Sequence, residues 1–261
     1  MDKVALITGG SSGIGRECAR ALADRGCRVY EMSRRETDND GVKHITGDIT
    51  SPEDCRRAVA KVMESEGRLD ILVNNAGIGI SGSAEFTEAE DAAKQIGVNF
   101  LGAANMCSAS LAALRASKGR IVNLSSVAAV TPIPFQAFYS ASKAAINAYT
   151  MALANEVRSY DVSVCAVMPG DVSTGFTEAR KKNENDGVYA KRVAQSVGKM
   201  ESDERGGMSA EYVGRYVAKI ALRRHIKPLY VTRFDYKALS VLAKILPCRT
   251  VNWIIGKLYA N

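Results

Sequence analysis

Tyr139 and Lys143 are four positions apart in a stretch with helical spacing of apolar residues, so on a helix their side chains share one face. A free tyrosine has a pKa of about 10, too high for a base at neutral pH, and a neighbouring ammonium favours the phenolate. A phenol tuned in this way can give a proton to a carbonyl oxygen or take one from an alcohol. This spacing is common on helix surfaces, so the pair indicates a catalytic site only when other motifs accompany it.

A glycine-rich turn near the N-terminus offers a second kind of chemistry. Residues 8–15 read TGGSSGIG and follow a strand-like apolar run at residues 4–7. Glycines permit a tight turn and a close backbone approach to a phosphate, and the N-terminus of the following helix offers free N–H groups to a pyrophosphate. The strand–turn–helix context therefore indicates a dinucleotide site.

The elements that must position these residues alternate along the chain. Short apolar runs predict strands at residues 4–7, 28–32, 44–46, 71–73, 120–124, 162–167 and 229–232. Amphipathic stretches predict helices near residues 14–25, 52–66, 87–115, 138–159 and 209–223. Several strands are apolar on both faces, as in a parallel sheet covered on each side. The alternation predicts an α/β fold, a doubly wound parallel sheet of about seven strands with helices on both faces.

Charge and cysteine content argue against a nucleic-acid-binding protein and against a disulfide-rich or metal-binding one. The 261 residues carry a net charge of +7, and residues 221–261, with eight basic and one acidic side chain, hold all of the excess. A nucleic-acid partner is not expected, because its electrostatic footprint would not be confined to one end. The six cysteines include no Cys-x-x-Cys pair, which favours unpaired thiols, a cytoplasmic location and no metal site. No uncharged apolar run is long enough to predict a membrane-spanning helix.

Further motifs follow in a fixed order. Residues 74–77 (NNAG) follow the fourth predicted strand, Asn99 lies in the next helix, and Ser126 follows the fifth strand. Residues 139–143 (YSASK) come thirteen positions after Ser126, and residues 169–174 (PGDVST) follow the sixth strand. With residues 8–15, this pattern resembles the short-chain dehydrogenase/reductase family over residues 3–175. The resemblance implies a Rossmann-like, dinucleotide-binding and catalytic domain over residues 1–261, and hydride transfer between a nicotinamide cofactor and an alcohol or carbonyl.

The resemblance also implies roles for the catalytic group. Tyr139 would be the general acid/base, and Lys143 would lower its pKa and hold the nicotinamide ribose. Ser126 would hydrogen-bond the substrate oxygen, and Asn99 would support a water-linked proton path behind Lys143. Ser125 competes for the serine role, but the thirteen-residue spacing favours Ser126, so Ser125 is expected to be structural.

The cofactor site implied by the resemblance draws on loops after six strands. Asp48 and Ile49 would contact the adenine, although Asp48 equally suits a capping position before a helix. Thr174 would contact the nicotinamide carboxamide, whereas Asp171 is expected to be a bystander. The full predicted set is Gly9, Ser11, Ser12, Gly13, Ile14, Gly15, Ser33, Arg34, Asp48, Ile49, Asn75, Ala76, Gly77, Tyr139, Lys143, Pro169, Gly170, Val172 and Thr174.

The end of the second strand bears on the choice between NAD and NADP. An acidic side chain there favours NAD, and an arginine accommodates the additional phosphate of NADP. Ser33 occupies the usual acidic position and Arg34 follows it, so we predict NADP(H) over NAD(H). Glu31 is the competing feature, because a strand that ended two residues earlier would let its carboxylate reach the ribose.

Two segments lie outside the shared motifs. Residues 174–207 include a charged stretch that could cover a substrate, or could be a solvated helix pair without a role. Residues 234–261 form a basic amphipathic extension broken at Pro247, similar to that of the subgroup with hydroxysteroid and retinol dehydrogenases. Three interpretations of the extension compete: packing on its own domain, contact with a lipid surface, and a dimer contact.

The sequence therefore predicts an NADP-dependent oxidoreductase that acts on a lipophilic, hydroxysteroid- or retinol-like substrate. A reductase of small ketones or aldehydes is the alternative enzyme, and a cofactor-sensing binding protein is the alternative without catalysis. The family pattern further implies a homo-oligomer, a dimer before a tetramer, paired through the helices at 87–115 and 138–159.

Overall fold

The computed structural model describes residues 3–36 and 41–260. Residues 1–2, 37–40 and 261 belong to the predicted domain but lie outside the described residues.

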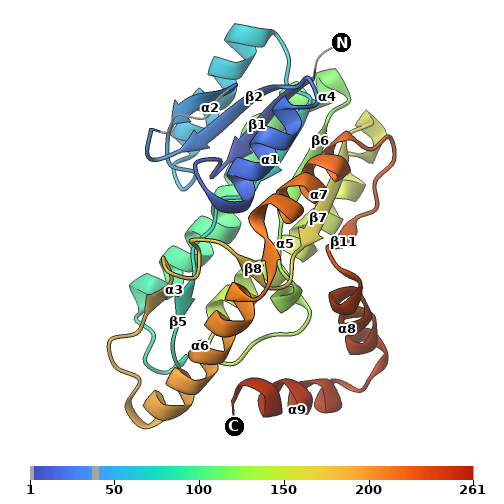
Figure 1. Ribbon diagram of the computed structural model, residues 1–261. Coiled ribbons are helices and arrows are strands. Elements are labelled where there is room, and N and C mark those ends of the chain that lie inside the picture. Colours follow the sequence, from blue (N-terminus) through green and yellow to red (C-terminus); the bar gives the residue numbers. More distant parts are fainter. Residues whose placement is uncertain (1–2, 37–40, 261) are drawn as a thin grey trace.

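A seven-stranded parallel sheet forms the centre of the molecule, in the order β11-β7-β6-β4-β1-β2-β3 (Figure 1). Every residue of β1, β4 and β6 is buried, which explains why their sequences are apolar on both faces. The predicted fold class is confirmed, and each predicted strand is present to within two residues at either end. The strands are β1 (Val4–Thr8), β2 (Arg28–Ser33), β3 (Val42–Thr46), β4 (Ile71–Asn74), β6 (Arg120–Leu124), β7 (Ser163–Met168) and β11 (Leu229–Val231).

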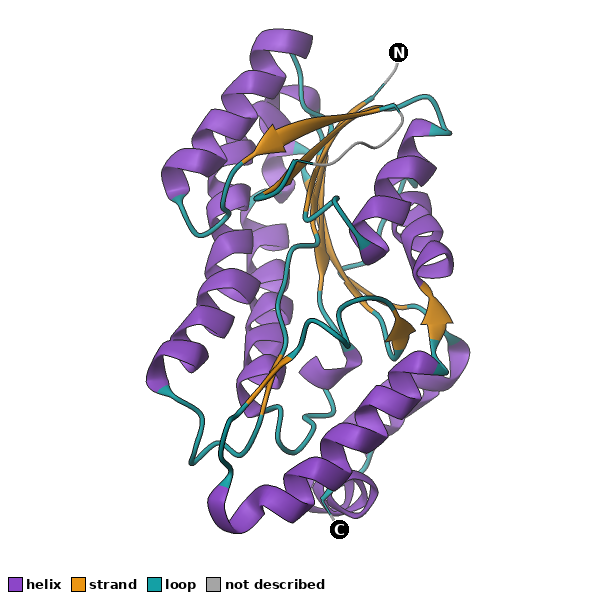
Figure 2. Ribbon diagram, turned by 60° about the vertical axis from the view of Figure 1, so that its left-hand side comes forward, coloured by secondary structure: helices purple, strands orange, loops and turns teal. Residues whose placement is uncertain are grey.

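Helices cover both faces of this sheet (Figure 2). Helices α1 (Gly13–Ala23) and α7 (Ala210–Leu222) pack on one face, and α2 (Pro52–Glu66), α4 (Gly102–Ser117) and α5 (Ala137–Glu156) pack on the other. Two apolar cores result, and successive strand residues enter opposite cores: Leu6 packs with α2 and α4, and Ile7 packs with α1 and α7.

Local signals set the ends of α2 where the sequence predicts them. The Ser51 hydroxyl accepts a hydrogen bond of 3.2 Å from the Asp54 amide, and Pro52 occupies the first helical turn. Gly67 ends the helix in the left-handed conformation at φ 67°. The short helices η2 (Val127–Ala129) and η3 (Arg158–Tyr160) flank α5.

The helix predicted near residues 87–115 is a continuous run of three parts. These are α3 (Ala89–Ile96), the π-helical turn η1 (Gly97–Leu101) and α4. By length and composition alone, Ala89–Ser117 is apolar enough to cross a membrane. Met106, Cys107 and Leu114 of this run are buried in the core beneath the sheet, so we interpret it as a core helix.

Short strands and a helix cross the carboxyl edge of the sheet. Strand β5 (Ile80–Ser81) pairs with β9 (Lys181–Lys182), and β8 (Val172–Ser173) pairs with β10 (Met208–Ser209). Between β9 and β10 lie η4 (Gly187–Tyr189) and α6 (Ala190–Arg205). Strand β9 thus joins residues 174–207 to β5, and the β8–β10 pair brings the two ends of this segment together.

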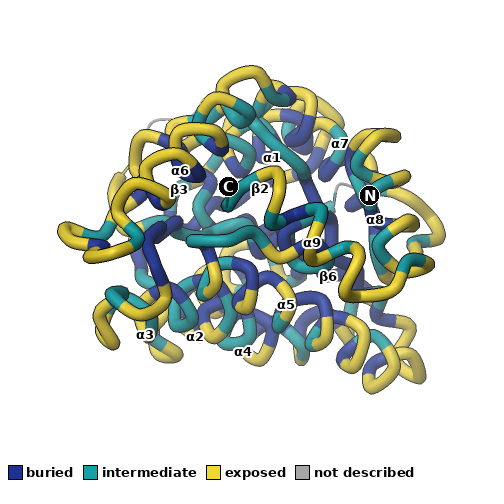
Figure 3. The backbone as a smooth tube through the Cα atoms, turned by 90° about the horizontal axis from the view of Figure 1, so that it is seen from below, coloured by how far each residue is buried: buried dark blue, intermediate teal, exposed yellow. Residues whose placement is uncertain are grey.

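The chain ends in α8 (Phe234–Ile245) and α9 (Cys248–Tyr259). The predicted break at Pro247 is present, because α8 stops before it and α9 starts after it. Figure 3 shows much of this C-terminal part in the exposed colour.

Candidate active site

Helix α5 places Tyr139 and Lys143 on one face, as their spacing predicts. The Lys143 ammonium lies 5.8 Å from the centroid of the Tyr139 ring. It donates a hydrogen bond of 2.8 Å to the carbonyl of Leu124, the last residue of β6. Lys143 is 5 % exposed, so this bond holds a buried cation at the carboxyl edge of the sheet.

Ser126 meets Tyr139 where β6 ends and α5 begins. Its hydroxyl is hydrogen-bonded to the Tyr139 phenol, and it also accepts a hydrogen bond of 3.1 Å from the Ala128 amide. Ser125 instead donates a hydrogen bond of 3.0 Å to the Lys143 carbonyl and is buried. Ser126, which is partly exposed, therefore faces Tyr139, whereas the Ser125 hydroxyl is held by the backbone of α5.

Burial dominates the protonation of the pair. It raises the pKa of Tyr139 to about 12, and the hydrogen bond from Ser126 opposes that rise only in part. Burial also lowers the pKa of Lys143 to about 8. Lys143 is directed to the Leu124 carbonyl, and the expectation that it lowers the pKa of Tyr139 stays a prediction. Tyr139 is therefore a neutral phenol, suited to giving a proton.

Asn99 lies in the π-helical turn η1, a kind of irregularity that often marks functional sites. Its side chain accepts a hydrogen bond of 2.8 Å from the Ile78 amide and donates one of 3.0 Å to the Ile78 carbonyl. It also donates to the Ser142 hydroxyl at 3.2 Å. A Cβ at Gly77 would lie 3.2 Å from the Asn99 Oδ1 and 3.8 Å from the Lys143 Nζ, so Gly77 lies beside both side chains.

The glycine-rich turn is rigid and fits a pyrophosphate. Gly9 has φ +66°, and a Cβ there would lie 2.9 Å from the Cα of Ala76. A Cβ at Gly15 would lie 2.3 Å from the Gly9 carbonyl oxygen. The Asn75 amide donates hydrogen bonds to the carbonyls of Thr8 and Gly9, at 3.1 and 3.0 Å. Asn75 thus shapes the turn rather than only facing a ligand.

The start of α1 is open beside this turn. Ser12 caps the helix without a side-chain hydrogen bond, which leaves the first amides of α1 to a ligand. Ser11 and Ile14 are partly exposed in the same turn. These features meet the steric and hydrogen-bonding needs of a dinucleotide phosphate.

Strand β2 continues to Ser33, so the alternative in which it ends at Glu31 is wrong. Glu31 is 1 % exposed, its carboxylate contacts the His44 imidazole, and it accepts a hydrogen bond of 3.2 Å from the Ser33 hydroxyl. A Cβ at Gly10 would lie 2.5 Å from the Glu31 Cβ, which places Glu31 beneath the turn. Arg34 is exposed just beyond the strand end.

Asp48 and Ile49 both have structural contacts. The Asp48 carboxylate accepts two hydrogen bonds of 2.8 Å, from the amide and hydroxyl of Thr50. The Ile49 side chain is buried against Gly102. A Cβ at Gly102 would lie only 2.6 Å from the Ile49 Cδ1. The expected adenine contacts stay a prediction.

The segment after β7 closes the other side of the site. The Pro169 carbonyl accepts a hydrogen bond of 2.9 Å from the Val127 amide. Thr174 faces the glycine-rich turn, with its Cβ 3.6 Å from where a Cβ of Gly13 would stand. Val172 is half-buried between these two points.

Asp171 is not a bystander, because it anchors the C-terminal extension. Tyr236 donates a hydrogen bond of 2.6 Å to the Asp171 carboxylate. The Tyr236 ring covers Gly170 so closely that a Cβ there would lie 2.2 Å from it. The sequence did not predict this contact, because only the fold brings residue 236 to residue 171.

Three side chains near Tyr139 were not predicted from the sequence. The Phe176 ring lies 6.0 Å from the Tyr139 ring, and the Arg180 guanidinium lies 5.7 Å from the centroid of Phe176. The Arg180 side chain is 1 % exposed and pairs with Glu204 of α6. Among the residues that the structure describes, its Nε and Nη1 have no hydrogen-bond partner. The charged composition of residues 174–207 was the available signal, but it pointed to no single residue.

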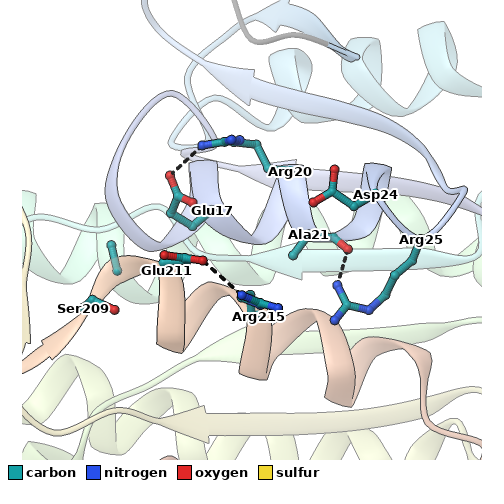
Figure 4. Close-up of a pocket in the computed structure, with 9 residues that line it drawn as sticks. Glu17, Arg20, Ala21, Asp24, Arg25, Ser209, Glu211 and Arg215 are labelled. Carbon is teal, nitrogen blue, oxygen red and sulfur yellow. Dashed lines mark hydrogen bonds and ion pairs between the residues drawn. The ribbon is translucent and has the colours of Figure 1, made fainter.

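A separate pocket lies on the outer side of α1 and α7 (Figure 4). Its charged side chains pair with one another, as Arg215 does with Glu211 at 3.1 Å and Arg20 with Glu17 at 3.7 Å. None of the residues expected to do chemistry lines it. Within residues 3–36 and 41–260, no three His, Cys, Asp or Glu side chains gather in a way that could hold a metal ion.

Known proteins share this arrangement. A family model described as short chain dehydrogenase matches residues 3–185. The chain belongs to the short-chain dehydrogenase family. As a short-chain dehydrogenase it is an oxidoreductase, an NAD(P)-dependent alcohol dehydrogenase or ketoreductase.

Two curated relatives of this short-chain dehydrogenase cover nearly all of its length. A 3-ketodihydrosphingosine reductase of Bacteroides thetaiotaomicron is 38% identical over 257 residues, 97% of this chain and 93% of the relative. An 11-beta-hydroxysteroid dehydrogenase A of Sesamum indicum is 31% identical over 270 residues, 98% of this chain and 75% of the relative. The predicted likeness to hydroxysteroid-type members is confirmed.

Two solved structures share its fold. A short chain dehydrogenase/reductase from Burkholderia phymatum in complex with NAD has a TM-score of 0.81 at 26% identity, covering 92% of each chain. A short chain dehydrogenase from Burkholderia cenocepacia in complex with NADP has a TM-score of 0.79 at 24% identity, covering 97% of each chain.

Proposed function

We propose that this short-chain dehydrogenase is an NADPH-dependent reductase of a lipophilic ketone. The observation that carries the proposal is the neutral, half-buried Tyr139, which is hydrogen-bonded to Ser126 and has the Phe176 ring 6.0 Å from its own. A neutral phenol and a hydroxyl on one substrate oxygen suit proton delivery during ketone reduction.

The bound nicotinamide would supply the hydride. Ser126 would donate a hydrogen bond to the ketone oxygen and orient it against Tyr139. Tyr139 would then transfer its phenolic proton to that oxygen as negative charge develops there. Lys143, held by the Leu124 carbonyl, would stabilise the resulting phenolate, and Asn99 would keep the turn at Ile78 in place. The same residues run the reverse, alcohol-oxidising direction with the proton moving back.

Preference for NADPH rests on the end of β2. Arg34 is exposed there, where its guanidinium can form paired, charge-assisted hydrogen bonds with a phosphate. The acidic competitor Glu31 is engaged with His44 and Ser33 beneath the turn. A carboxylate held in this way is poorly placed to accept hydrogen bonds from a ribose.

Apolar side chains around the site support a lipophilic substrate. Phe176 lies against Tyr139, and Ile133 and Phe135 pack on the buried apolar side of α6. The Bacteroides relative is named for a long-chain ketone, and the sesame relative for a steroid. We favour a long-chain ketone because the relative so named is similar at higher identity over nearly the whole of both chains.

Location and assembly complete the proposal. Five of the six cysteines are buried and all are free, which suits a cytoplasmic enzyme. Leu101 and Met151 are 52% and 44% exposed on the outer sides of the helices that would pair in a dimer. Burial of such side chains favours a homodimer.

The proposal is tested by NADPH oxidation with 3-ketodihydrosphingosine, a ketosteroid, a retinoid aldehyde and a small ketone, each repeated with NADH. We expect the highest kcat/KM with the long-chain ketone and NADPH. Turnover of only the small ketone would contradict the lipophilic assignment. Cofactor binding without any turnover would instead favour the cofactor-sensing alternative.

A further inference from the structure

The C-terminal helices expose an unusual share of apolar surface. Of the eleven large hydrophobic side chains that are exposed in the described residues, six lie on α8 and α9: Phe234, Val241, Leu242, Ile245, Trp253 and Leu258. Phe234 is 81% exposed and Ile245 is 74% exposed. Such a patch marks a site of contact with another surface.

On α8, the apolar residues form one outward stripe. Phe234, Val241 and Ile245 follow one another at intervals of seven and four positions, which places them on one side of the helix. Lys237 and Lys244 are also exposed and lie along one edge of this stripe.

Helix α9 also exposes a large apolar side chain, that of Trp253. Trp253 is 63% exposed, and Arg249 and Lys257 are exposed four positions before and after it on the same side of the helix. Tryptophan flanked by basic residues is typical of a helix that lies at a membrane interface.

The charge of this surface has one sign. Residues 236–260 contain four basic side chains and no acidic one. The preceding acid, Asp235, is already paired with Arg233 at 2.6 Å. An anionic surface complements this charge, whereas a second copy of the same surface would bring like charges together.

The inward sides of α8 and α9 contact Asp171 and helix α6. Tyr236 bonds to Asp171, and the Tyr259 hydroxyl donates to Asp203 of α6 at 3.4 Å. Arg192 of α6 donates a hydrogen bond of 2.8 Å to the Ala260 carbonyl. Contacts on the inward side leave the apolar and basic side facing away, next to the segment that carries Phe176.

We propose that α8 and α9 dock the enzyme on an anionic lipid surface, with the apolar stripe and Trp253 inserted among the headgroups. This proposal rests on the proposed function for its purpose: a lipid ketone would pass from the membrane to a site covered by residues 174–207. The docking itself requires no catalysis and can be tested apart from it.

Trp253 is the only tryptophan, so its fluorescence reports on this surface directly. The full-length protein, without cofactor or substrate, is titrated with vesicles of phosphatidylcholine alone or with phosphatidylglycerol added. We expect a blue shift and co-sedimentation with the anionic vesicles, weakened by high salt. No shift and no co-sedimentation would overturn the proposal. A blue shift that follows protein concentration without vesicles would overturn it in favour of a second copy of the chain.

Two pairs of variants separate the apolar and basic contributions. Phe234→Ser with Ile245→Ser should abolish vesicle binding, whereas Val188→Ser, which changes a side chain that is 88% exposed elsewhere, should bind as the wild type does. Lys237→Gln with Lys244→Gln should weaken binding roughly 25-fold, about fivefold for each lysine. Lys61→Gln with Lys219→Gln removes the same charge from other helices and should have little effect.

Activity distinguishes failure of docking from failure of the proposed function. All these variants should reduce a water-soluble short-chain ketone at the wild-type rate, because none touches the site. The α8 variants should lose turnover only of a ketone carried in vesicles. Vesicle binding equal to the wild type in both α8 variants would contradict the proposal, whatever the enzyme reduces.

Discussion

The ammonium of Lys143 donates a 2.8 Å hydrogen bond to the carbonyl of Leu124. This bond joins the helix that carries Tyr139 to the strand that leads into Ser126. Burial takes this cation out of water, so the pKa of Lys143 falls from 10.5 to about 8. Burial of the charged Lys143 therefore lowers the free energy of unfolding of the protein.

That cost should appear in the pH dependence of stability. Between about pH 8 and 10.5 the unfolded chain keeps the lysine proton and the folded chain does not, so the free energy of unfolding should rise with pH in this window. The rise contributed by Lys143 should be roughly 3 kcal/mol in all. Urea unfolding of the wild type and of Lys143→Met across this window measures it. Equal slopes for the two proteins would show that Lys143 keeps an ordinary pKa.

Arg34 should set the choice of cofactor. Arg34→Ala should raise the KM for NADPH by about tenfold to a hundredfold, because a charge-assisted pair with the phosphate is lost. The KM for NADH should stay the same. Arg56→Ala, which removes an exposed arginine of α2, is the matched control. An unchanged preference for NADPH in Arg34→Ala would refute this role.

Phe176 should favour lipophilic substrates. Phe176→Ala removes the ring beside Tyr139, so kcat/KM for a long-chain ketone should fall about tenfold, with little change for a small ketone. Phe86→Ala is the control, because Phe86 packs on Tyr189 instead, at a ring distance of 6.3 Å. Equal losses for both ketones would mean that Phe176 only supports the fold.

The ion pair between Arg180 and Glu204 should stabilise the segment formed by residues 174–207. Arg180→Met leaves a carboxylate without its buried partner and should lower the free energy of unfolding by about 3 kcal/mol. Adding Glu204→Met should restore much of that loss, since no charge then remains unpaired. A double-mutant cycle by urea unfolding checks the coupling. Strictly additive losses would mean that the two side chains do not interact.

Apolar periodicity predicted the sheet and its main helices, and the four-residue spacing placed Tyr139 and Lys143 on one helix face. The grouping of Ser126 with this pair was predicted by the resemblance to short-chain dehydrogenases. The sequence did not predict the β5–β9 and β8–β10 pairs, which are two residues long and carry no periodic signal. It also missed the roles of Asp171 and Arg180, since their partners Tyr236 and Glu204 are distant in sequence. The raised pKa of Tyr139 follows from burial, which only the folded chain reveals.

Tyr139 is the proposed proton donor, and Tyr139→Phe tests this role most directly. The variant keeps the ring and removes only the hydroxyl. With NADPH and the best ketone, kcat should fall by about 10²–10⁴-fold, while NADPH binding measured by cofactor fluorescence should stay as in the wild type. Turnover within a few-fold of the wild type, or loss of NADPH binding, would contradict the account.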